Sequence, residues 1–440
     1  MGHLVGKDIY GKLGEKIDNL TVKAPWNDAL YKILKELYAG EEAELVVKMP
    51  YNLSNLQRLS KITGYEPTRV KGMLDKLTHK GLVIDLANNG EYYYMPSPMV
   101  IGVFEFTMMR TQGNLNSKVW AELFHAYMSE SADFHRANAG DGQRVSIARA
   151  VPHRDTVAPE EAVEILPYEK AEAIVASHNK FAIGLCSCRH EKLHLDLKSC
   201  DVPLDTCASF GYAADYLIRN GMAQEVSRRE MLDNLERSRE LGLVFSADNV
   251  KRNVTFICSC CSCCCNILHG INNFGYHNTL VTSSFIAGVD KEKCTGCGKC
   301  ARACPINAIK MEQAAAAEGR TIKSKYYAQV EASICLGCGV CALKCASGAL
   351  QLKKREQKVI HPETTFERNI LQSLERGNLQ NFIFDSPEAV THRVMRGLIG
   401  GFLRLSPVKK ALMSDQLRSA FLSMMTAGVK LQGGGWMTKI

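Results

Sequence analysis

The amino-acid sequence lacks the features of a membrane-spanning or exported chain. Its 440 residues contain no continuous apolar segment long enough to cross a bilayer, and the longest apolar stretches, such as Gly397 to Leu403, are short and interrupted. The amino terminus, Met1 to Asp8, has no basic region followed by an apolar stretch, which is the pattern of a secretory signal. We therefore expect a cytoplasmic chain without a transmembrane span.

Short motifs of several enzyme classes are also missing. No Gly-x-Gly-x-x-Gly follows a predicted strand, and the chain has neither a Gly-x-x-x-x-Gly-Lys-Ser/Thr loop nor a Gly-x-Ser-x-Gly elbow. These absences argue against a bound dinucleotide, ATP hydrolysis and a serine nucleophile. The formal charge of +8 is modest for this length and suits an acidic partner, a membrane surface or nucleic acid without deciding among them.

Cysteine is missing from most of the chain and crowded into the rest. The first 185 residues and the last 95 contain none, so all 18 cysteines lie between Cys186 and Cys345. A cytoplasmic chain meets a reducing environment in which disulfides are disfavoured. Metal binding is therefore the expected role of these thiols.

Eight of the cysteines form two runs with the same spacing, Cys-x-x-Cys-x-x-Cys-x-x-x-Cys. The first run is Cys294, Cys297, Cys300 and Cys304, and the second run is Cys335, Cys338, Cys341 and Cys345. The flanking residues repeat as well, which indicates an internal duplication. An iron-sulfur cubane needs thiolates that converge from several directions, and glycine allows the tight loop that supplies them. The expected loop glycines are Gly296, Gly298, Gly337 and Gly339.

With these motifs, residues 286–353 resemble the bacterial two-cluster ferredoxin family. The resemblance implies two 4Fe-4S clusters, each held by three cysteines of one run and the last cysteine of the other. The implied ligands are Cys294, Cys297, Cys300 and Cys345 for cluster 1, and Cys335, Cys338, Cys341 and Cys304 for cluster 2. Zinc is the alternative, but zinc sites rarely need this strict spacing twice.

Two features depart from the family pattern, and neither removes a ligand. Ala346 stands where a proline is expected after the last cysteine, and Met311 to Tyr327 lengthen the segment between the runs. We expect the missing proline to alter the fold-back around one cluster and its potential. The insert around Ala314 to Ala317 is expected to form a short surface helix.

The ten upstream cysteines follow two predicted strands, Phe181 to Leu185 and Val254 to Ile257. Helices are predicted for Tyr168 to Ala176, Tyr212 to Arg219 and Arg228 to Leu241, so this region is interpreted as α/β. The cysteines are Cys186, Cys188, Cys200, Cys207, Cys258, Cys260, Cys261, Cys263, Cys264 and Cys265.

So many free thiols favour a bound metal. Our preferred hypothesis for the upstream cysteines is a third iron-sulfur cluster, with zinc and unmetallated or catalytic thiols as alternatives, and the ligand set is unresolved. His190 and His194 are spaced to share a helix face. Two solvent-facing histidines beside Lys192 are a simpler interpretation than two further ligands.

The amino-terminal region is similar in its predicted element order to a winged-helix domain. A helix is predicted after Pro25 with Leu30, Ile33, Leu34 and Leu37 on one stripe, followed by a short strand at Leu45 to Val47. Helices at Ser54 to Ile62 and Pro67 to Lys80 follow. A hairpin then brackets Asn88 to Gly90.

A DNA-binding version of this domain would place the helix Pro67 to Lys80 in a major groove, with Arg69, Lys71 and Lys76 near phosphates. Glu66 and Asp75 dilute that charge. The strand containing Tyr92 to Tyr94 suits packing better, and winged helices also serve as protein-docking modules. DNA binding is therefore an alternative that we do not favour.

The remaining segments are predicted to be mainly helical. Ser117 to Tyr127 is a helix, and Ala137 to Pro159 is interpreted as a polar connector. The tail is predicted as helices Pro362 to Leu374, Pro387 to Leu405 and Pro407 to Met425, followed by a flexible end with Trp436 as an anchor. Its basic residues would suit peripheral contact with an anionic membrane or an acidic partner, and solvated helix faces are the simpler interpretation. These residues are Arg393, Arg396, Arg404, Lys409, Lys410 and Arg418.

Together these patterns predict an α+β multidomain protein. We expect a winged-helix-like domain over residues 1–100, a helical segment and connector over 101–160, an α/β cysteine-rich domain over 161–283, a two-cluster ferredoxin domain over 284–353 and a helical extension over 354–440.

The leading functional hypothesis is an iron-sulfur electron-transfer protein, or a subunit of an oxidoreductase complex, that relays single electrons through its clusters. Its partners would be a redox protein or oxidoreductase subunits, in an anaerobic or low-oxygen setting. Whether the chain is an enzyme stays open, and a complete enzyme is less expected than an electron-transfer component. The alternatives are a redox-sensing winged-helix transcription regulator and an enzyme whose upstream cysteines hold a substrate-binding cluster.

Overall fold

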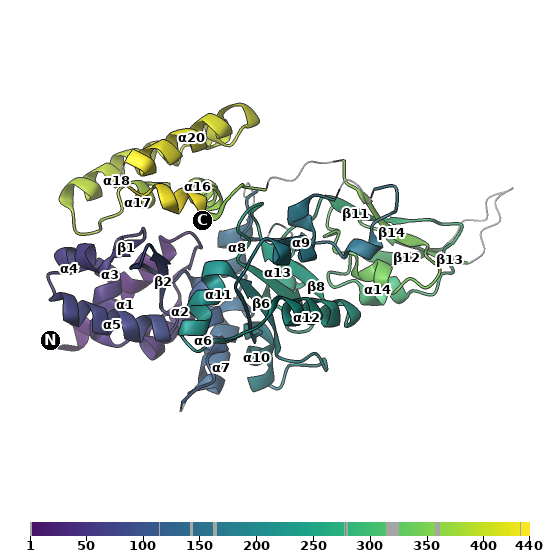
Figure 1. Ribbon diagram of the computed structural model, residues 1–440, viewed down its shortest axis with the longest axis horizontal. Coiled ribbons are helices and arrows are strands. Elements are labelled where there is room, and N and C mark those ends of the chain that lie inside the picture. Colours follow the sequence, from purple (N-terminus) through teal and green to yellow (C-terminus); the bar gives the residue numbers. More distant parts are fainter. Residues whose placement is uncertain are drawn as a thin grey trace.

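The computed structural model describes residues 2–113, 115–140, 144–161, 165–276, 278, 280–313, 325–356, 361–431 and 433–440. The protein is a mixed α/β multidomain structure, elongated with the amino-terminal region at one end and the cysteine runs at the other (Figure 1). None of the helices in the described ranges is long and apolar enough to span a membrane.

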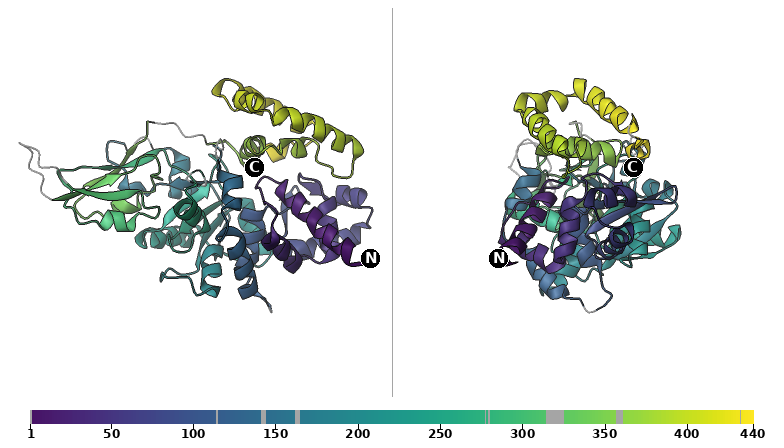
Figure 2. Two further views of the ribbon diagram at one scale, coloured as in Figure 1. Left: turned by 180° about the vertical axis from the view of Figure 1, so that it is seen from behind. Right: turned by 90° about the vertical axis from the view of Figure 1, so that its left-hand side faces the viewer.

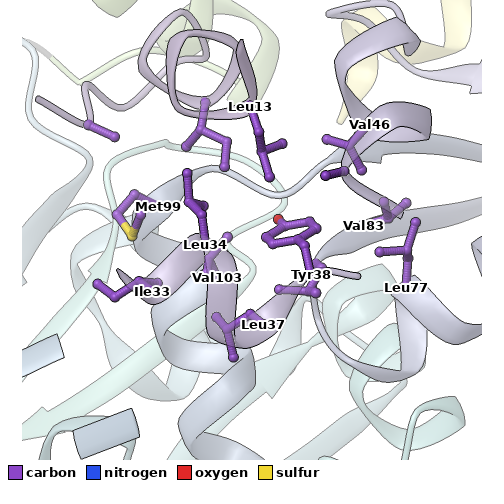
Figure 3. Packing of buried hydrophobic residues seen from close by; sticks show 14 of the residues in the cluster. Leu13, Ile33, Leu34, Leu37, Tyr38, Val46, Leu77, Val83, Met99 and Val103 are labelled. Carbon is purple, nitrogen blue, oxygen red and sulfur yellow. The ribbon is translucent and has the colours of Figure 1, made fainter. Parts of the chain in front are cut away.

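The amino-terminal region combines helices with a three-stranded sheet of order β1-β3-β2. Its elements are α1 (Gly2–Asp18), α2 (Asp28–Leu37), α3 (Gly40–Lys48), β1 (Ser54–Asn55), α4 (Leu56–Thr63), α5 (Pro67–His79), β2 (Val83–Asn88) and β3 (Glu91–Pro96). The predicted stripe of α2 is buried, and Figure 3 shows Ile33, Leu34 and Leu37 packed near Leu13 and Tyr38. The order of β1, α4, α5 and the hairpin agrees with the sequence, and the winged-helix assignment stays a prediction.

The short strand predicted at Leu45 to Val47 is wrong, because these residues lie in α3. The carboxylate of Glu42 accepts a hydrogen bond from the Ala39 N–H at 2.9 Å and thereby starts the helix. Leu45 and Val46 are fully buried in the same core as α2. Packing of one helical face therefore outweighs the strand preference of the β-branched residues.

The middle region is built on a seven-stranded, mainly antiparallel sheet of order β10-β4-β8-β9-β6-β5-β7. The strands are β4 (Ala148–Val151), β5 (Phe181–Leu185), β6 (Asp205–Phe210), β7 (Ala223–Glu225), β8 (Val244–Asp248), β9 (Phe256–Cys260) and β10 (Leu280–Val281). Its helices are α9 (Ala171–Ala176), α10 (Ser187–His194), α11 (Gly211–Arg219), α12 (Arg228–Glu240) and α13 (Asn266–Phe274). The two predicted strands and the three predicted helices are all present within a few residues.

The segment interpreted as a polar connector contains a strand of this sheet. β4 is fully buried and pairs antiparallel with β8. Arg149 makes this segment look polar in the sequence. In the fold its guanidinium is buried and donates to the carbonyl oxygen of Val250 at 3.3 Å. Helices α6 (Phe104–Met109), α7 (Ser117–Met128) and α8 (Asp133–Ala139) precede it, and their buried residues extend the amino-terminal core.

The cysteine runs lie in a small region with two two-stranded sheets. It consists of β11 (Phe285–Val289), α14 (Lys299–Ala303), β12 (Ile309–Gln313), β13 (Tyr326–Val330), α15 (Val340–Leu343) and β14 (Leu350–Lys354). The helix predicted around Ala314 to Ala317 lies outside the described residues.

The tail forms a helical layer beside the amino-terminal region (Figure 2). Its helices are α16 (Thr365–Arg376), α17 (Leu379–Ile383), α18 (Val390–Leu403), α19 (Ser406–Leu412) and α20 (Asp415–Leu431). The third predicted tail helix is thus divided into α19 and α20. The end is more ordered than predicted: Gly435–Lys439 form a 3-10 turn, and the Trp436 ring lies 4.9 Å from the ring of Tyr93.

Helix α11 fixes the β2–β3 hairpin to the middle region. The hydroxyl of Tyr216 donates to the carbonyl oxygen of Val83 at 2.9 Å. The Arg219 guanidinium donates to both carboxylate oxygens of buried Asp85, at 2.7 and 3.2 Å. The hairpin is therefore held against the body by buried polar contacts.

We predict that Arg219→Met lowers the free energy of unfolding by about 1.5 to 3 kcal/mol, because it leaves a buried carboxylate without its charged partner. Arg69→Met is the matched control, since Arg69 pairs with exposed Glu41 and should contribute less than about 1 kcal/mol. Thermal unfolding of both variants at low and high salt measures the difference. Equal destabilisation would contradict the buried contact.

Candidate metal centres

The two cysteine runs are joined by an exchange of strands. Each run lies between two strands of its own repeat, yet β11 pairs with β14 and β12 pairs with β13. The backbone N–H of Asp290 donates to Ala349 at 2.7 Å, and at the equivalent position Glu331 donates to Ala308 at 2.8 Å. Neither repeat therefore completes its own sheet, and each brings its last strand to the other.

The loop glycines have the backbone conformation that the sequence predicts. Gly296 and Gly298 have φ of +69°, and Gly337 and Gly339 have φ of +66° and +86°. These values lie in the left-handed region, which glycine adopts without steric cost. In the second run the loop is also packed tightly, because a Cβ atom on Gly337 would lie 2.0 Å from the carbonyl oxygen of Phe285.

Four cysteines from both runs line one apolar cavity: Cys304, Cys335, Cys338 and Cys341. Its other walls include Ile306, Leu336 and Leu352. Burial, together with the charges of the neighbouring Cys335 and Cys304 thiolates, raises the pKa of Cys338 to about 12. Such a thiol binds as a thiolate only when a metal stabilises its charge. The cavity and its donors therefore fit a 4Fe-4S cluster.

The other four cysteines of the runs differ in burial: Cys294 and Cys300 are buried, Cys345 is half-buried and Cys297 is exposed. Burial, followed by the charges of Cys345 and Cys294, raises the pKa of Cys300. Cys297 is exposed, and a hydrogen bond from the Lys299 N–H lowers its pKa. Thiolates from both runs thus influence one another here as well, which fits a second cluster.

The missing proline leaves the turn after the second run unchanged. The Asn307 N–H donates to Cys304 at 3.4 Å, and the equivalent Gly348 N–H donates to Cys345 at 3.1 Å. Asn307 and Gly348 also share a left-handed φ, +55° and +64°. The fold-back after the second run therefore matches that after the first run, although Ala346 replaces the proline.

The ten upstream cysteines separate into two sets. The four-thiol set is Cys200, Cys261, Cys263 and Cys264, whose sulfur atoms all lie within 4.8 Å of one another. The remaining cysteines, which we term the six-thiol set, are Cys186, Cys188, Cys207, Cys258, Cys260 and Cys265. They come from the ends of β5 and β9, from β6 and from the starts of α10 and α13. The sheet thus gathers residues that are far apart in the sequence.

Thiol contacts connect the six-thiol set in the interior. Hydrogen bonds from Cys258 and Cys265 lower the pKa of Cys260 to about 6. A hydrogen bond from Cys258 also lowers the pKa of Cys207. Cys188 interacts with Cys265, and this contact and burial raise its pKa. Two of the six thiols are buried and four are half-buried. Such a mutually polarised group of thiols is a suitable ligand set for a metal centre.

Arg189 lies between the two sets and was missed by the sequence analysis. It is fully buried, and its guanidinium donates to Ser259 and to Pro203, the latter at 3.2 Å. Although burial opposes this, the charges of Cys186 and Cys261 raise the pKa of Arg189. The sequence contained one indication of its role, because Arg189 directly follows the Cys186-Ser-Cys188 motif. A fixed cation there offsets the charge of nearby thiolates.

The expectation of two solvent-facing histidines on α10 is wrong for His190. His190 is buried with its Nδ1 2.6 Å from the carbonyl oxygen of Met108, and its Nε2 lies 3.0 Å from that of half-buried His194. Lys192 is fully buried and pairs with Glu191 at 2.6 Å. The helix is charged in sequence but internal in the fold, because its charges neutralise one another.

Comparison with known families identifies the part of the chain that holds the two runs. Residues 293–360 match the family described as the 4Fe-4S dicluster domain. Searches of curated proteins and of solved structures gave no significant match. The predicted resemblance to two-cluster ferredoxins is confirmed, and the chain contains a ferredoxin-like iron-sulfur domain. This domain and the upstream cysteines indicate iron-sulfur electron transfer.

We predict that Gly337→Ala removes about half of the iron of the ferredoxin-like domain, because the added methyl group meets a backbone carbonyl in the loop of cluster 2. Gly298→Ala is the matched control. Its φ is similar, but its methyl group meets side chains alone, those of Arg302 at 3.2 Å and Met311 at 3.8 Å. This variant should keep its iron and lose about 1 to 2 kcal/mol of stability. Iron analysis after anaerobic purification separates the two outcomes. Equal iron in both variants would refute the packing argument.

Proposed function

We propose that the protein relays single electrons between a partner protein and a third iron-sulfur centre on the six-thiol set. Two 4Fe-4S clusters in the ferredoxin-like domain supply one-electron transfer at the intermediate positions. The observation that carries the proposal is the exchange of strands, which places Cys304 beside Cys335, Cys338 and Cys341. The relay would operate in a reducing, low-oxygen cytoplasm.

The ligand sets implied by the sequence resemblance are supported by the arrangement of both runs. The cavity lined by Cys304 contains no other cysteine of the first run. Conversely, Cys345 of the second run is the neighbouring charge that raises the pKa of Cys300 most, after the effect of burial. Cluster 1 would thus be held by Cys294, Cys297, Cys300 and Cys345, and cluster 2 by Cys335, Cys338, Cys341 and Cys304.

Burial suggests the order of the two clusters. Cys297 is exposed, whereas Cys338 is buried and its carbonyl oxygen accepts a hydrogen bond from the His153 N–H at 3.1 Å. The cluster 1 side therefore faces solvent, and the cluster 2 side docks on the middle region. A surface groove between α14 and α15 carries Lys299, Arg302 and Lys344, which suits an acidic redox partner.

Helix α13 supports a path from cluster 2 to the six-thiol set. Cys265 caps its amino terminus, and Asn272 near its other end donates to the carbonyl oxygen of Pro305, beside Cys304, at 2.9 Å. The step of seven residues from Cys265 to Asn272 corresponds to an axial length of about 10 Å. One continuous hydrophobic core also contains Cys260, Cys265 and the buried cysteines of both runs. Such a closely packed interior suits short electron-transfer steps.

The alternative of a DNA-reading winged helix is not favoured. Exposed Arg69 and Lys71 on α5 are paired with Glu41 and Asp75, so they offer little free positive charge to phosphates. The hairpin that would act as a wing is fixed by Arg219.

The crossed ligand sets predict that iron losses in double variants depend on which cysteines are combined. Cys304→Ala and Cys338→Ala should each remove about four irons, and the double variant should remove no more, because both residues serve cluster 2. Cys304→Ala combined with Cys294→Ala should remove about eight. Iron and acid-labile sulfide, measured on protein purified without oxygen, give the result.

An additive loss for Cys304 with Cys338, together with a non-additive loss for Cys304 with Cys294, would show that each run holds its own cluster. Loss of iron without loss of sulfide would contradict cubane clusters altogether.

We also propose that α18 binds the surface of an anionic membrane. Val390, Val394, Leu398, Phe402 and Leu405 form a stripe at helical spacing, and each is more than half exposed. Residues 389–414 contain no acidic residue. Their basic residues are Arg393, Arg396, Arg404, Lys409 and Lys410.

An apolar stripe rimmed by positive charge alone suits anionic lipid better than a second copy of the same chain, because two such faces would repel each other. The apolar side chains would enter the headgroup boundary, and exposed Arg393 and Lys410 would contact lipid phosphates. Arg396, Arg404 and Lys409 donate to backbone carbonyl oxygens of the tail and would add to the positive potential of this face. Such binding is peripheral and reversible.

We predict that the protein sediments with phosphatidylcholine vesicles containing phosphatidylglycerol, that salt weakens the binding, and that pure phosphatidylcholine vesicles do not bind it. Leu398→Glu with Phe402→Glu should lower the affinity at least about tenfold. Leu241→Glu, at an exposed leucine of the middle region, should not change it. Equal sedimentation of the double variant and wild type would refute the proposal, and a change from dimer to monomer would assign the stripe to a second copy instead.

A further inference from the structure

The four-thiol set is too compact for an iron-sulfur cubane. The sulfur atom of Cys261 lies 3.8 Å from that of Cys200 and 3.7 Å from that of Cys263, and Cys263 and Cys264 are 3.5 Å apart. In a 4Fe-4S cluster each cysteine binds a different iron, so the separation of the irons is added to every sulfur–sulfur distance. The set therefore requires a smaller occupant.

A single tetrahedral metal ion fits these distances. Metal–sulfur bonds of about 2.3 Å, the value for zinc, give a tetrahedron whose sulfur–sulfur edges are about 3.8 Å. In the described part of the chain this is the one set of metal-ligating side chains identified with such close ligand atoms. We propose that Cys200, Cys261, Cys263 and Cys264 form a mononuclear tetrathiolate site for a zinc ion, distinct from all iron-sulfur centres of this protein.

The surroundings of the set suit a tetrathiolate ion, which carries a net negative charge. Buried Arg189 lies beside Cys261 and supplies a fixed positive charge there. Cys264 is fully buried, and the other three thiols are half-buried. With four protein ligands, the ion has no open position for a substrate, so its role would be structural.

Such an ion would orient the ligands of the neighbouring centre. Cys200 lies in the loop before β6, and the other three ligands follow β9. Along the chain, Cys260 and Cys265 of the six-thiol set stand immediately before and after Cys261 to Cys264. An ion that ties these two loops together would also fix the positions of Cys260 and Cys265, which are both buried. On this proposal the upstream cysteines form two metal sites. The sequence predicted a single additional metal site there.

Metal analysis of the full chain, purified without oxygen, tests this proposal. We expect about one zinc per chain. Cys263→Ala should lose the zinc while the iron and sulfide of the ferredoxin-like domain remain. Ser262→Ala is the matched control, because this exposed residue lies in the same loop and offers no thiol. It should retain the zinc.

Zinc X-ray absorption spectroscopy of the wild type gives a readout that does not depend on a variant's folding. Four sulfur ligands at about 2.3 Å are expected. Iron and sulfide lost together in Cys263→Ala, zinc bound by nitrogen or oxygen, or no metal at the set would each overturn the proposal. A mononuclear iron ion, lost from Cys263→Ala without sulfide, would support the single-ion site and replace zinc as its occupant. None of these readouts depends on electron transfer, so the relay proposal is tested separately.

Discussion

The exchange of strands between the two cysteine repeats is the constraint on which the iron-sulfur region depends. Because β11 pairs with β14 and β12 with β13, neither repeat closes its sheet alone. The same exchange brings Cys304 of the first run into one cavity with three cysteines of the second run. Folding of the domain and assembly of its clusters are therefore coupled events, since paired strands and bound thiolates stabilise the same arrangement.

The two cysteine runs of the ferredoxin-like domain differ in how they contact the middle region. The second run is packed against His153 and Ser283, which leaves little room at Gly337, whereas the first run has an exposed thiol. A basic groove lies at the surface between the short helices of the two runs. Helix α13 then continues inward to Cys265. The cysteine runs and Cys265 are thus linked through one continuous core, which is the physical basis of the proposed relay.

Strongly local signals allowed much of the structure to be predicted from the sequence. The duplicated spacing identified the ferredoxin-like domain, and β5 was predicted with its observed ends, Phe181 and Leu185. Errors arose where tertiary contacts decide. Leu45 and Val46 look like strand residues but pack on one face of α3, and β4 was hidden because a buried arginine made it look polar. Lys192 looked exposed because its partner Glu191 cancels its charge only within the fold. The division of the upstream cysteines could not be predicted from the sequence either, since Cys261 belongs to the compact four-thiol set and its neighbour Cys260 does not.

Freeze-quench electron paramagnetic resonance after mixing the anaerobic protein with a one-electron reductant protein tests the relay most directly. We expect the ferredoxin-like clusters to be reduced first and a separate upstream centre to follow, with the second step strongly slowed when Cys338 is replaced by alanine. An upstream centre reduced at an unchanged rate in that variant, or no reducible centre on the six-thiol set, would contradict the relay.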